Sequence, residues 1–401
     1  MNESIKAVLN CSAGKDANAA STQFSVENAL KVNNFHKSFP GYQPSPLADL
    51  KSLAKALGVK GIYVKDESAR FGLNAFKGLG GSYCIGKYIA DRLNMDISDL
   101  SYEKINSAEI HDKLGEITFV TATDGNHGRG IAWTANCLGH KSAVYMPKGS
   151  SLERLNNIKA LGAEASITDL NYDDTVRLAS KKSKENGWVL VQDTAWEGYE
   201  EIPGWIMQGY TTMAYEIIGQ LKEKPTHIFL QAGVGAMAGA LTGFFADYYD
   251  EREKPAIIIV EPNKADCVFR TAAAADGRMH PVTGNMDTVM AGLACGEPCT
   301  IGWNVLKTYA DHFVSIPDWV AAKGMRILGN PMGEDAKVIS GESGAATLGF
   351  AAEIMQNASL DYLRNQLNLE PDSKILCIST EGDTDKENYR KIVWDGLCPS
   401  F

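Results

Sequence analysis

Short β-rich runs alternate with amphipathic helical stretches along this chain of 401 residues. The runs are rich in β-branched and other apolar residues and cover 61–65, 117–121, 142–146, 165–168, 188–192, 226–231, 256–261, 312–316 and 374–379. Helical periodicity between them is clearest at 151–161, 173–186, 205–222 and 345–357. Runs such as 257–260 are apolar on both faces, which is typical of parallel strands covered by helices. The pattern predicts an α/β protein with right-handed crossovers.

The composition limits the partners that the chain can bind. A net charge of −10 and the lack of a block of basic residues argue against nucleic acid. Residues 1–12 are polar and lack the apolar core of a signal peptide, and no window approaches the ~18 apolar residues that span a bilayer. We therefore expect a cytoplasmic protein that binds neither nucleic acid nor a membrane.

Eight cysteines are scattered through the sequence, which favours a reduced compartment over a disulfide framework. A disulfide that uses Cys267 or Cys295 stays open at this stage. The spacing of Cys295 and Cys299 is compatible with zinc, but no second cysteine pair lies nearby, so no metal site is predicted.

One lysine, Lys77, lies among small residues at the predicted start of a helix, in the segment 72–81 (Gly-Leu-Asn-Ala-Phe-Lys-Gly-Leu-Gly-Gly). A lysine that forms a Schiff base must be deprotonated in its free form, and neighbouring glycines permit the close approach of a flat ring. Small neighbours are also expected where a helix start packs tightly. The segment alone does not separate these two interpretations.

A glycine-rich loop follows the run 226–231 and precedes an apolar helical stretch. Backbone N–H groups at such a helix start bind phosphate. The spacing Gly-x-Gly-x-x-x-Gly differs from the dinucleotide fingerprint, and the Gly-Lys-Ser/Thr ending of a P-loop is missing. The loop predicts an anion site, and a tight turn without a ligand is the alternative. The candidate residues are Gly233, Val234, Gly235, Ala236, Met237 and Gly239.

A second strand end carries the segment 123–128, Thr-Asp-Gly-Asn-His-Gly. Asn126 can bond a phenolate oxygen, and Thr123 with the exposed amides can hold a carboxylate. Asp124 is unusual there, because its carboxylate would repel a carboxylate bound at the same turn. Such an unfavourable charge is often found where acid–base chemistry needs it. We interpret His127 as structural rather than as a base.

A third strand end places the neutral hydroxyl of Thr380 directly after the apolar run 375–378. A neutral partner leaves a pyridine nitrogen largely unprotonated, which suits β-elimination. Ligands of open α/β sheets bind beyond the carboxyl ends of the strands, so we expect these loops to converge.

The order of these segments resembles the fold type II pyridoxal phosphate enzymes, of the tryptophan synthase β and threonine dehydratase kind. The similarity covers about residues 39–385, and within the group the chain looks like the diaminopropionate ammonia-lyases. The segments that carry this likeness are 74–77, 121–128, 192–196, 291–297 and 379–384. Threonine dehydratases usually carry Ser-Ala-Gly-Asn-His at 123–127, so Asp124 argues against simple serine or threonine dehydration.

The resemblance implies a cofactor, pyridoxal 5′-phosphate, and a reaction, α,β-elimination of D- and L-2,3-diaminopropionate to pyruvate and ammonia. It assigns the cofactor to Lys77, Asn126, the 233–239 loop and Thr380. Lys77 would also remove the α-proton of the L isomer, and Asp124 that of the D isomer. Asp193 is the next candidate, as a partner for the substrate's side-chain ammonium, with a structural cap as its alternative. If a second carboxylate such as that of Asp193 lies near Asp124, the pKa of one of the two carboxyl groups is raised.

We expect residues 77–192 to form a smaller α/β domain, and residues 1–76 with 193–401 to form a larger one that binds the cofactor. A homodimer is implied by the family alone. Two other functions stay open: another fold type II lyase or dehydratase acting on serine, threonine or cysteine, and a nucleotide-binding oxidoreductase that uses the 233–239 loop.

Overall fold

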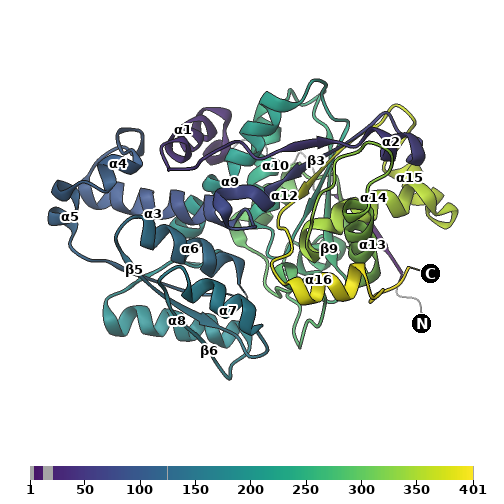
Figure 1. Cartoon of the computed structure of the whole chain (residues 1–401). Coiled ribbons are helices and arrows are strands. Elements are labelled where there is room, and N and C mark those ends of the chain that lie inside the picture. Colours follow the sequence, from purple (N-terminus) through teal and green to yellow (C-terminus); the bar gives the residue numbers. More distant parts are fainter. Residues whose placement is uncertain (1–3, 12–20, 124, 401) are drawn as a thin grey trace. The chain divides into compact units, whose positions relative to one another are not determined.

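The computed structural model describes residues 4–11, 21–123 and 125–400, and the chain divides into two compact units (Figure 1). Unit 1 comprises Met1–Ser25, Ser45–Ala69 and Glu216–Phe401, and unit 2 comprises Val26–Pro44 and Arg70–Tyr215. Unit 2 is thus wider than the segment 77–192 expected from the sequence. It also takes in α1 (Val26–Lys37) and most of α9 (Glu201–Gln220).

Among its described residues, unit 1 contains a seven-stranded sheet with the order β1-β10-β9-β8-β11-β3-β2. Its strands are β1 (Lys6–Leu9), β2 (Leu47–Asp49), β3 (Gly61–Asp66), β8 (His227–Gln231), β9 (Ala256–Pro262), β10 (His312–Ile316) and β11 (Lys374–Ser379). The five inner strands pair in parallel, and the two edge strands pair antiparallel to their neighbours. The carboxyl ends of β8 and β11 therefore lie side by side.

Unit 1 also contains helices, which lie between and after these strands in the sequence. They are α2 (Lys51–Leu57), α10 (Ala236–Tyr248), α11 (Cys267–Ala274), α12 (Thr300–Tyr309), α13 (Asp318–Gly329), α14 (Glu342–Gln356), α15 (Asp361–Gln366) and α16 (Lys386–Val393). Figure 1 shows α13 beside α14, and a Cβ on Gly349 would lie 2.0 Å from the carbonyl oxygen of Val320. The core of unit 1 joins these helices to the strands, because residues such as Ile258, Val260 and Phe350 are fully buried in one apolar cluster.

Unit 2 contains, in its described part, a four-stranded parallel sheet with the order β6-β5-β4-β7. The strands are β4 (Thr118–Ala122), β5 (Lys141–Met146), β6 (Glu164–Ile167) and β7 (Val189–Leu190). Besides α1 and most of α9, its helices are α3 (Lys77–Leu93), α4 (Tyr102–Ile105), α5 (Ala108–Leu114), α6 (Asn126–Cys137), α7 (Leu152–Lys159) and α8 (Tyr172–Asn186).

Local signals explain where several helices of unit 2 begin and end. The side chain of Asn171 accepts a hydrogen bond from the N–H of Asp174 and so caps the start of α8, while Gly187 ends that helix with φ of 68°. The side chain of Ser151 caps α7 in the same way. These caps are readable in the sequence, so the boundaries of α7 and α8 lie close to the predicted ones.

The predicted fold class is confirmed: the chain is an α/β protein built on parallel sheets. Each of the nine predicted runs contains a described strand, although β7 keeps only two residues of the run 188–192. The sequence analysis missed β1 and β2, which are short edge strands with partly exposed residues. Such strands lack the continuous apolar pattern that identifies a buried parallel strand.

None of the helices described here is long and apolar enough to cross a membrane. All eight cysteines belong to the described residues, and each is a free thiol, so the open possibility of a disulfide at Cys267 or Cys295 is not realised in this structure.

Candidate active site

Lys77 is the first residue of α3, as the sequence predicted. The glycines that follow it are needed for packing: a Cβ on Gly80 would lie 2.5 Å from the Tyr210 ring, and a Cβ on Gly81 would lie 3.2 Å from the backbone of Gly130. The close approach of α3 to α9 and α6 therefore explains these small residues without a ligand. Of the two interpretations of this segment, the structure supports tight packing for Gly80 and Gly81.

The side chain of Lys77 forms an ion pair with Asp193. The Nζ atom lies 2.5 Å from Oδ2, and the two side chains are 22% and 11% exposed. The rings of Phe76 and Tyr210 lie 5.3 and 5.8 Å from the same nitrogen. The aromatic rings and partial burial desolvate this lysine, whereas the carboxylate of Asp193 favours its charged form, so the two side chains form an ion pair.

His127 is the second cationic partner available to Asp193. Its Nε2 lies 2.8 Å from the carbonyl oxygen of Val191, and because a carbonyl only accepts, Nε2 carries the hydrogen. Its Nδ1 lies 3.7 Å from Oδ2 of Asp193. His127 is therefore held in one orientation by the strand that leads to Asp193, which agrees with its interpretation as structural.

The carboxyl group of Asp193 is held in its ionised form. Burial alone would raise its pKa, but the charges of His127 and Lys77 and the hydrogen bond from Lys77 lower the pKa to about 2. The sequence analysis expected a raised pKa for one carboxyl of an Asp124–Asp193 pair, and for Asp193 the direction is the opposite. Asp124 itself lies outside the described residues.

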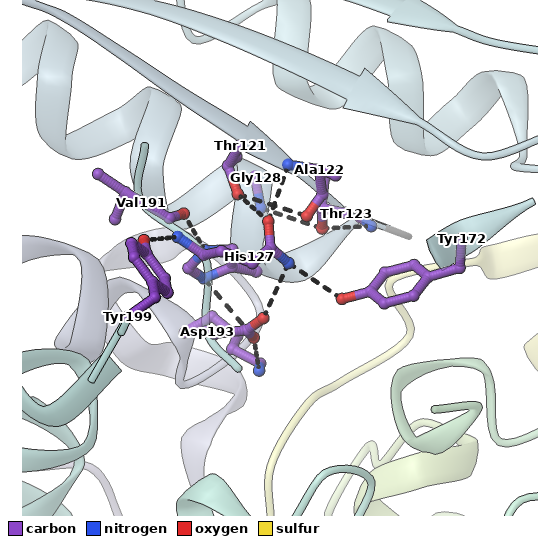
Figure 2. A network of polar contacts seen from close by, with 12 residues as sticks. Thr121, Ala122, Thr123, His127, Gly128, Tyr172, Val191, Asp193 and Tyr199 are labelled. Carbon is purple, nitrogen blue, oxygen red and sulfur yellow. Dashed lines mark hydrogen bonds and ion pairs between the residues drawn. The ribbon is translucent and has the colours of Figure 1, made fainter. Parts of the chain in front are cut away.

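Figure 2 shows Thr121, Ala122, Tyr172 and Asp193 in one polar network, and the side chain of Gln192 connects them. Its Oε1 accepts hydrogen bonds from the N–H of Ala122 at 3.1 Å and from the hydroxyl of Thr121 at 3.2 Å. Its Nε2 donates to the hydroxyl of Tyr172 at 3.1 Å and reaches Oδ1 of Asp193 at 3.5 Å. The network fixes the segment that follows β7 against the end of β4, and so fixes the position of Asp193.

Thr123 organises the turn between β4 and α6. Its Oγ1 accepts hydrogen bonds from the N–H groups of Gly125, at 2.9 Å, and Gly128, at 3.1 Å. Two amides that the sequence analysis regarded as exposed are thus already bonded within the turn. Asn126 is the first residue of α6, at the same end of the β4 strand as Thr123.

The 233–239 loop of unit 1 leads from β8 into α10. Gly235 is the N-cap of α10 and adopts a left-handed conformation with φ of 88°, which favours glycine. The first turn of α10 carries no acidic side chain. A helix start of this kind, with no side chain as its cap, offers its first backbone N–H groups to an anion.

Gly239 has a different environment from the rest of this loop. Its N–H donates to the carbonyl of Gly235 inside the helix, and a Cβ there would lie 2.8 Å from the Cα of Gly302 in α12. The close contact between α10 and α12 is a sufficient reason for this glycine.

Thr380 follows β11 and is 4% exposed. Its Oγ1 accepts a hydrogen bond of 3.1 Å from Nε2 of Gln231, the last residue of β8. Because β8 and β11 are parallel neighbours, their carboxyl ends bring Thr380 close to the start of the glycine-rich loop.

The structure therefore brings the predicted residues together in two groups, one in each unit. Unit 2 holds Lys77, Asp193, Thr123 and Asn126, and unit 1 holds the glycine-rich loop and Thr380. Sequence reasoning missed the amides that organise each group, Gln192 and Gln231. A signal was present, because each is a polar residue at the end of an otherwise apolar run.

Comparisons with known proteins agree with this chemistry. The family described as "Pyridoxal-phosphate dependent enzyme" matches residues 39–381. The diaminopropionate ammonia-lyase of Salmonella typhimurium is 54% identical over 371 residues, which are 91% of this chain and 92% of that protein. The crystal structure of the holo diaminopropionate ammonia-lyase from Escherichia coli has a TM-score of 0.92 and 48% identity, covering 99% of this chain and 98% of that one. A complex of the E. coli enzyme with an aminoacrylate–PLP azomethine reaction intermediate has a TM-score of 0.91 and 47% identity over 99% and 98% of the two chains.

The chain belongs to the family of pyridoxal-phosphate-dependent enzymes, with the fold type II architecture. Its cofactor is pyridoxal 5′-phosphate, and the relatives reported above are ammonia-lyases. Each unit, taken by itself, holds groups of the kind that the cofactor needs: unit 2 has a lysine at a helix start, and unit 1 has a helix start with a left-handed glycine and no side-chain cap. The nucleotide-binding oxidoreductase considered from the sequence is excluded by this family membership.

Proposed function

We propose that the chain catalyses the α,β-elimination of ammonia from 2,3-diaminopropionate. Hydrolysis of the released aminoacrylate then gives pyruvate and a second ammonia. The observation that carries this proposal is the partly buried ion pair between Lys77 and Asp193, in a chain 54% identical to a diaminopropionate ammonia-lyase. The pair supplies an amine and, beside it, a carboxylate suited to a substrate that carries two ammonium groups.

Pyridoxal phosphate, when bound, supplies an electron sink that eases loss of the α-proton. The amine of Lys77 would hold the cofactor and take the α-proton of the L isomer. By the roles that the resemblance implies, Asn126 would bond the phenolate oxygen, the 233–239 loop would bind the phosphate, and Thr380 would bond the ring nitrogen. Of the loop, Gly235 and the first residues of α10 are the better candidates, because Gly239 uses its N–H within the helix.

Asp193 would bind the substrate's side-chain ammonium, the group that leaves. A carboxyl with a pKa of about 2 is ionised at neutral pH and pairs with an ammonium as it now pairs with Lys77. His127 would keep Asp193 ionised and oriented when Lys77 is engaged elsewhere. Thr123 would act on the substrate carboxylate through the turn that it organises.

Asp124 would remove the α-proton of the D isomer. Lys77 reaches one face of a planar substrate, so a proton on the opposite face needs another base. In the sequence, Asp124 belongs to the segment 123–128, which the resemblance assigns to the substrate. The enzyme would thus accept both isomers.

The test of the reaction is substrate screening on the purified enzyme. Pyruvate and ammonia are measured with D- and L-2,3-diaminopropionate, serine, threonine and cysteine. The proposal expects the diaminopropionate isomers to be turned over with the highest kcat/KM. A higher kcat/KM for serine or threonine would replace it with the dehydratase alternative. A homodimer and a cytoplasmic location belong to the same proposal, and light scattering and cell fractionation test them.

A further inference from the structure

The side-chain amide of Gln231 has an orientation that its surroundings determine. Its Nε2 lies 2.8 Å from the carbonyl oxygen of Ile378 and 3.1 Å from that of Ser343. Carbonyl oxygens only accept hydrogen bonds, so the atom facing them must be the NH2 group. Gln231 is 1% exposed, so water cannot supply the hydrogen bonds that the opposite orientation of the amide would need.

This orientation decides how the hydroxyl of Thr380 is used. Its Oγ1 lies 3.1 Å from the same Nε2, and an amide nitrogen never accepts a hydrogen bond. Gln231 therefore donates and Thr380 accepts, with two amide hydrogens shared over three acceptors. The hydroxyl hydrogen of Thr380 cannot point at Gln231 and is directed to another acceptor. Within the described chain, Gln231 is the one hydrogen-bond partner found for this hydroxyl.

We infer that Gln231 is a positioning residue that keeps Thr380 as a hydrogen-bond donor to the ring nitrogen of the cofactor. The inference rests on the proposed function, which puts Thr380 at that nitrogen. A hydroxyl that donates stabilises the unprotonated nitrogen, whereas a hydroxyl that accepts would stabilise the protonated one. The amide of Gln231, four residues before the N-cap Gly235, thereby sets the protonation of the ring and its strength as an electron sink.

The test uses two substitutions of Gln231 with different hydrogen-bonding capacity. Gln231→Met keeps an unbranched chain and removes the NH2 group. Gln231→Glu is nearly isosteric, and its ionised carboxylate can only accept a hydrogen bond from Thr380, which reverses the direction of the bond. Thr380→Val removes the hydroxyl itself. Ser343→Ala is the matched control, because it perturbs the same contact of α14 but keeps the carbonyl that Gln231 binds.

Two measurements that do not depend on turnover are made on each variant. One is the 15N resonance of ring-labelled pyridoxal phosphate in the holoenzyme, which reports ring protonation. The other is the dissociation constant of the cofactor, from titration of the resolved enzyme. We expect an unprotonated ring in the parent and in Ser343→Ala, and a shift toward the protonated position in Gln231→Glu. Gln231→Met and Thr380→Val should each raise the dissociation constant by about 2- to 10-fold, the usual effect of one hydrogen bond.

The double variant Gln231→Met/Thr380→Val separates positioning from general destabilisation. Because both substitutions act through one bond, their effects on cofactor binding should not add, whereas independent packing defects would add. An unchanged ring resonance in both Gln231 variants, with a changed one in Thr380→Val, would overturn the inference and leave Thr380 at the nitrogen. An unchanged resonance in Thr380→Val would remove the assignment of Thr380 itself. If Gln231→Met does not fold, the resonance of Gln231→Glu decides the inference alone.

Discussion

The Nζ atom of Lys77 lies 2.5 Å from Oδ2 of Asp193, although 116 residues separate the two in the sequence. The start of α3 supplies the amine, and the segment after β7 supplies the carboxylate. Since His127 also lies 3.7 Å from the same oxygen, Asp193 is bordered by two potential cations. The carboxylate can therefore stay ionised whether Lys77 is free or bound to the cofactor.

Replacing Lys77 tests whether it carries the cofactor. Lys77→Ala and Lys77→Arg should both abolish turnover and the visible absorbance of the bound cofactor, because neither side chain can form the covalent link. Borohydride should fix the cofactor on the parent enzyme only. An alanine variant that kept both the absorbance and normal turnover would refute the assignment.

Asp193 should contribute to the stability of the cofactor-free enzyme in a pH-dependent manner. Its pKa is lowered from 3.8 to about 2, which corresponds to about 2 kcal/mol of unfolding free energy near neutral pH. A carboxyl with a lowered pKa stabilises the folded state above its unfolded pKa. That contribution is lost as the pH falls from about 4 through about 2, because the group then becomes protonated.

The measurement is urea unfolding of the parent and Asp193→Asn at pH 7 and at about pH 3. The difference between the two proteins should be about 2 kcal/mol at pH 7 and should shrink at the lower pH. Asp174→Asn is the control, because its pair with Arg177 is exposed and should contribute less than about 1 kcal/mol. A difference independent of pH would show that Asp193 acts through shape rather than charge.

Local patterns were enough to predict most elements of the fold and the ends of several strands. Buried parallel strands such as β9 and β11 are continuous apolar runs, and Lys77 at the start of α3 could be read from its neighbours. The pairing of Lys77 with Asp193 could not be predicted, because it depends on how β4 and β7 are ordered in the sheet. The edge strands β1 and β2 were also not predicted, since they are defined by the strands they pair with rather than by a pattern in their own residues.

The roles of the Gln192 and Gln231 side chains could not be predicted from the sequence for a related reason. A glutamine at a strand end has no fixed partner until the neighbouring strand is in register. Gln192 meets Ala122 only because β7 pairs with β4, and Gln231 meets Thr380 only because β8 pairs with β11. The glycines near Lys77 were recognised in the sequence, but their role was not. Their small size is compatible both with a cofactor nearby and with the close helix contacts found in the structure.

Gln192→Leu should lower the stability of the enzyme and weaken substrate binding, because Gln192 holds Asp193 in position. The substitution leaves the N–H of Ala122 without its acceptor, at a cost of about 1–3 kcal/mol for a buried group, and removes one of the two acceptors of the Thr121 hydroxyl. We expect a lower unfolding free energy and a raised KM for diaminopropionate, with nearly unchanged cofactor binding. Tyr172→Phe is the matched control, since it removes only the hydroxyl bonded to Nε2. A KM equal to that of the parent would exclude a role in substrate binding.

Gly235→Ala should weaken phosphate binding. The residue has φ of 88°, which strains any side chain there, and a Cβ would lie 3.2 Å from a methyl group of Leu306 and 3.4 Å from one of Val268, which must give by a few tenths of an ångström. Gly149→Ala is the control, with φ of 89° and no atom within 4 Å of the added Cβ. Both variants should lose a similar backbone contribution to stability, but only Gly235→Ala should raise the dissociation constant of pyridoxal phosphate. Equal dissociation constants for the two variants would place the phosphate elsewhere.

Asp124→Asn should separate the two substrate isomers. The amide keeps the size of the side chain but cannot accept a proton, so activity on D-2,3-diaminopropionate should fall by about 10²-fold or more, the usual scale for a lost general base. Activity on the L isomer should fall much less, because the proposed mechanism assigns that proton to Lys77 on the other face. The measurement is kcat/KM for each isomer, together with the exchange of the α-hydrogen in heavy water. Equal losses on both isomers would make Asp124 a binding or structural residue, and an unaffected D activity would remove it from the mechanism.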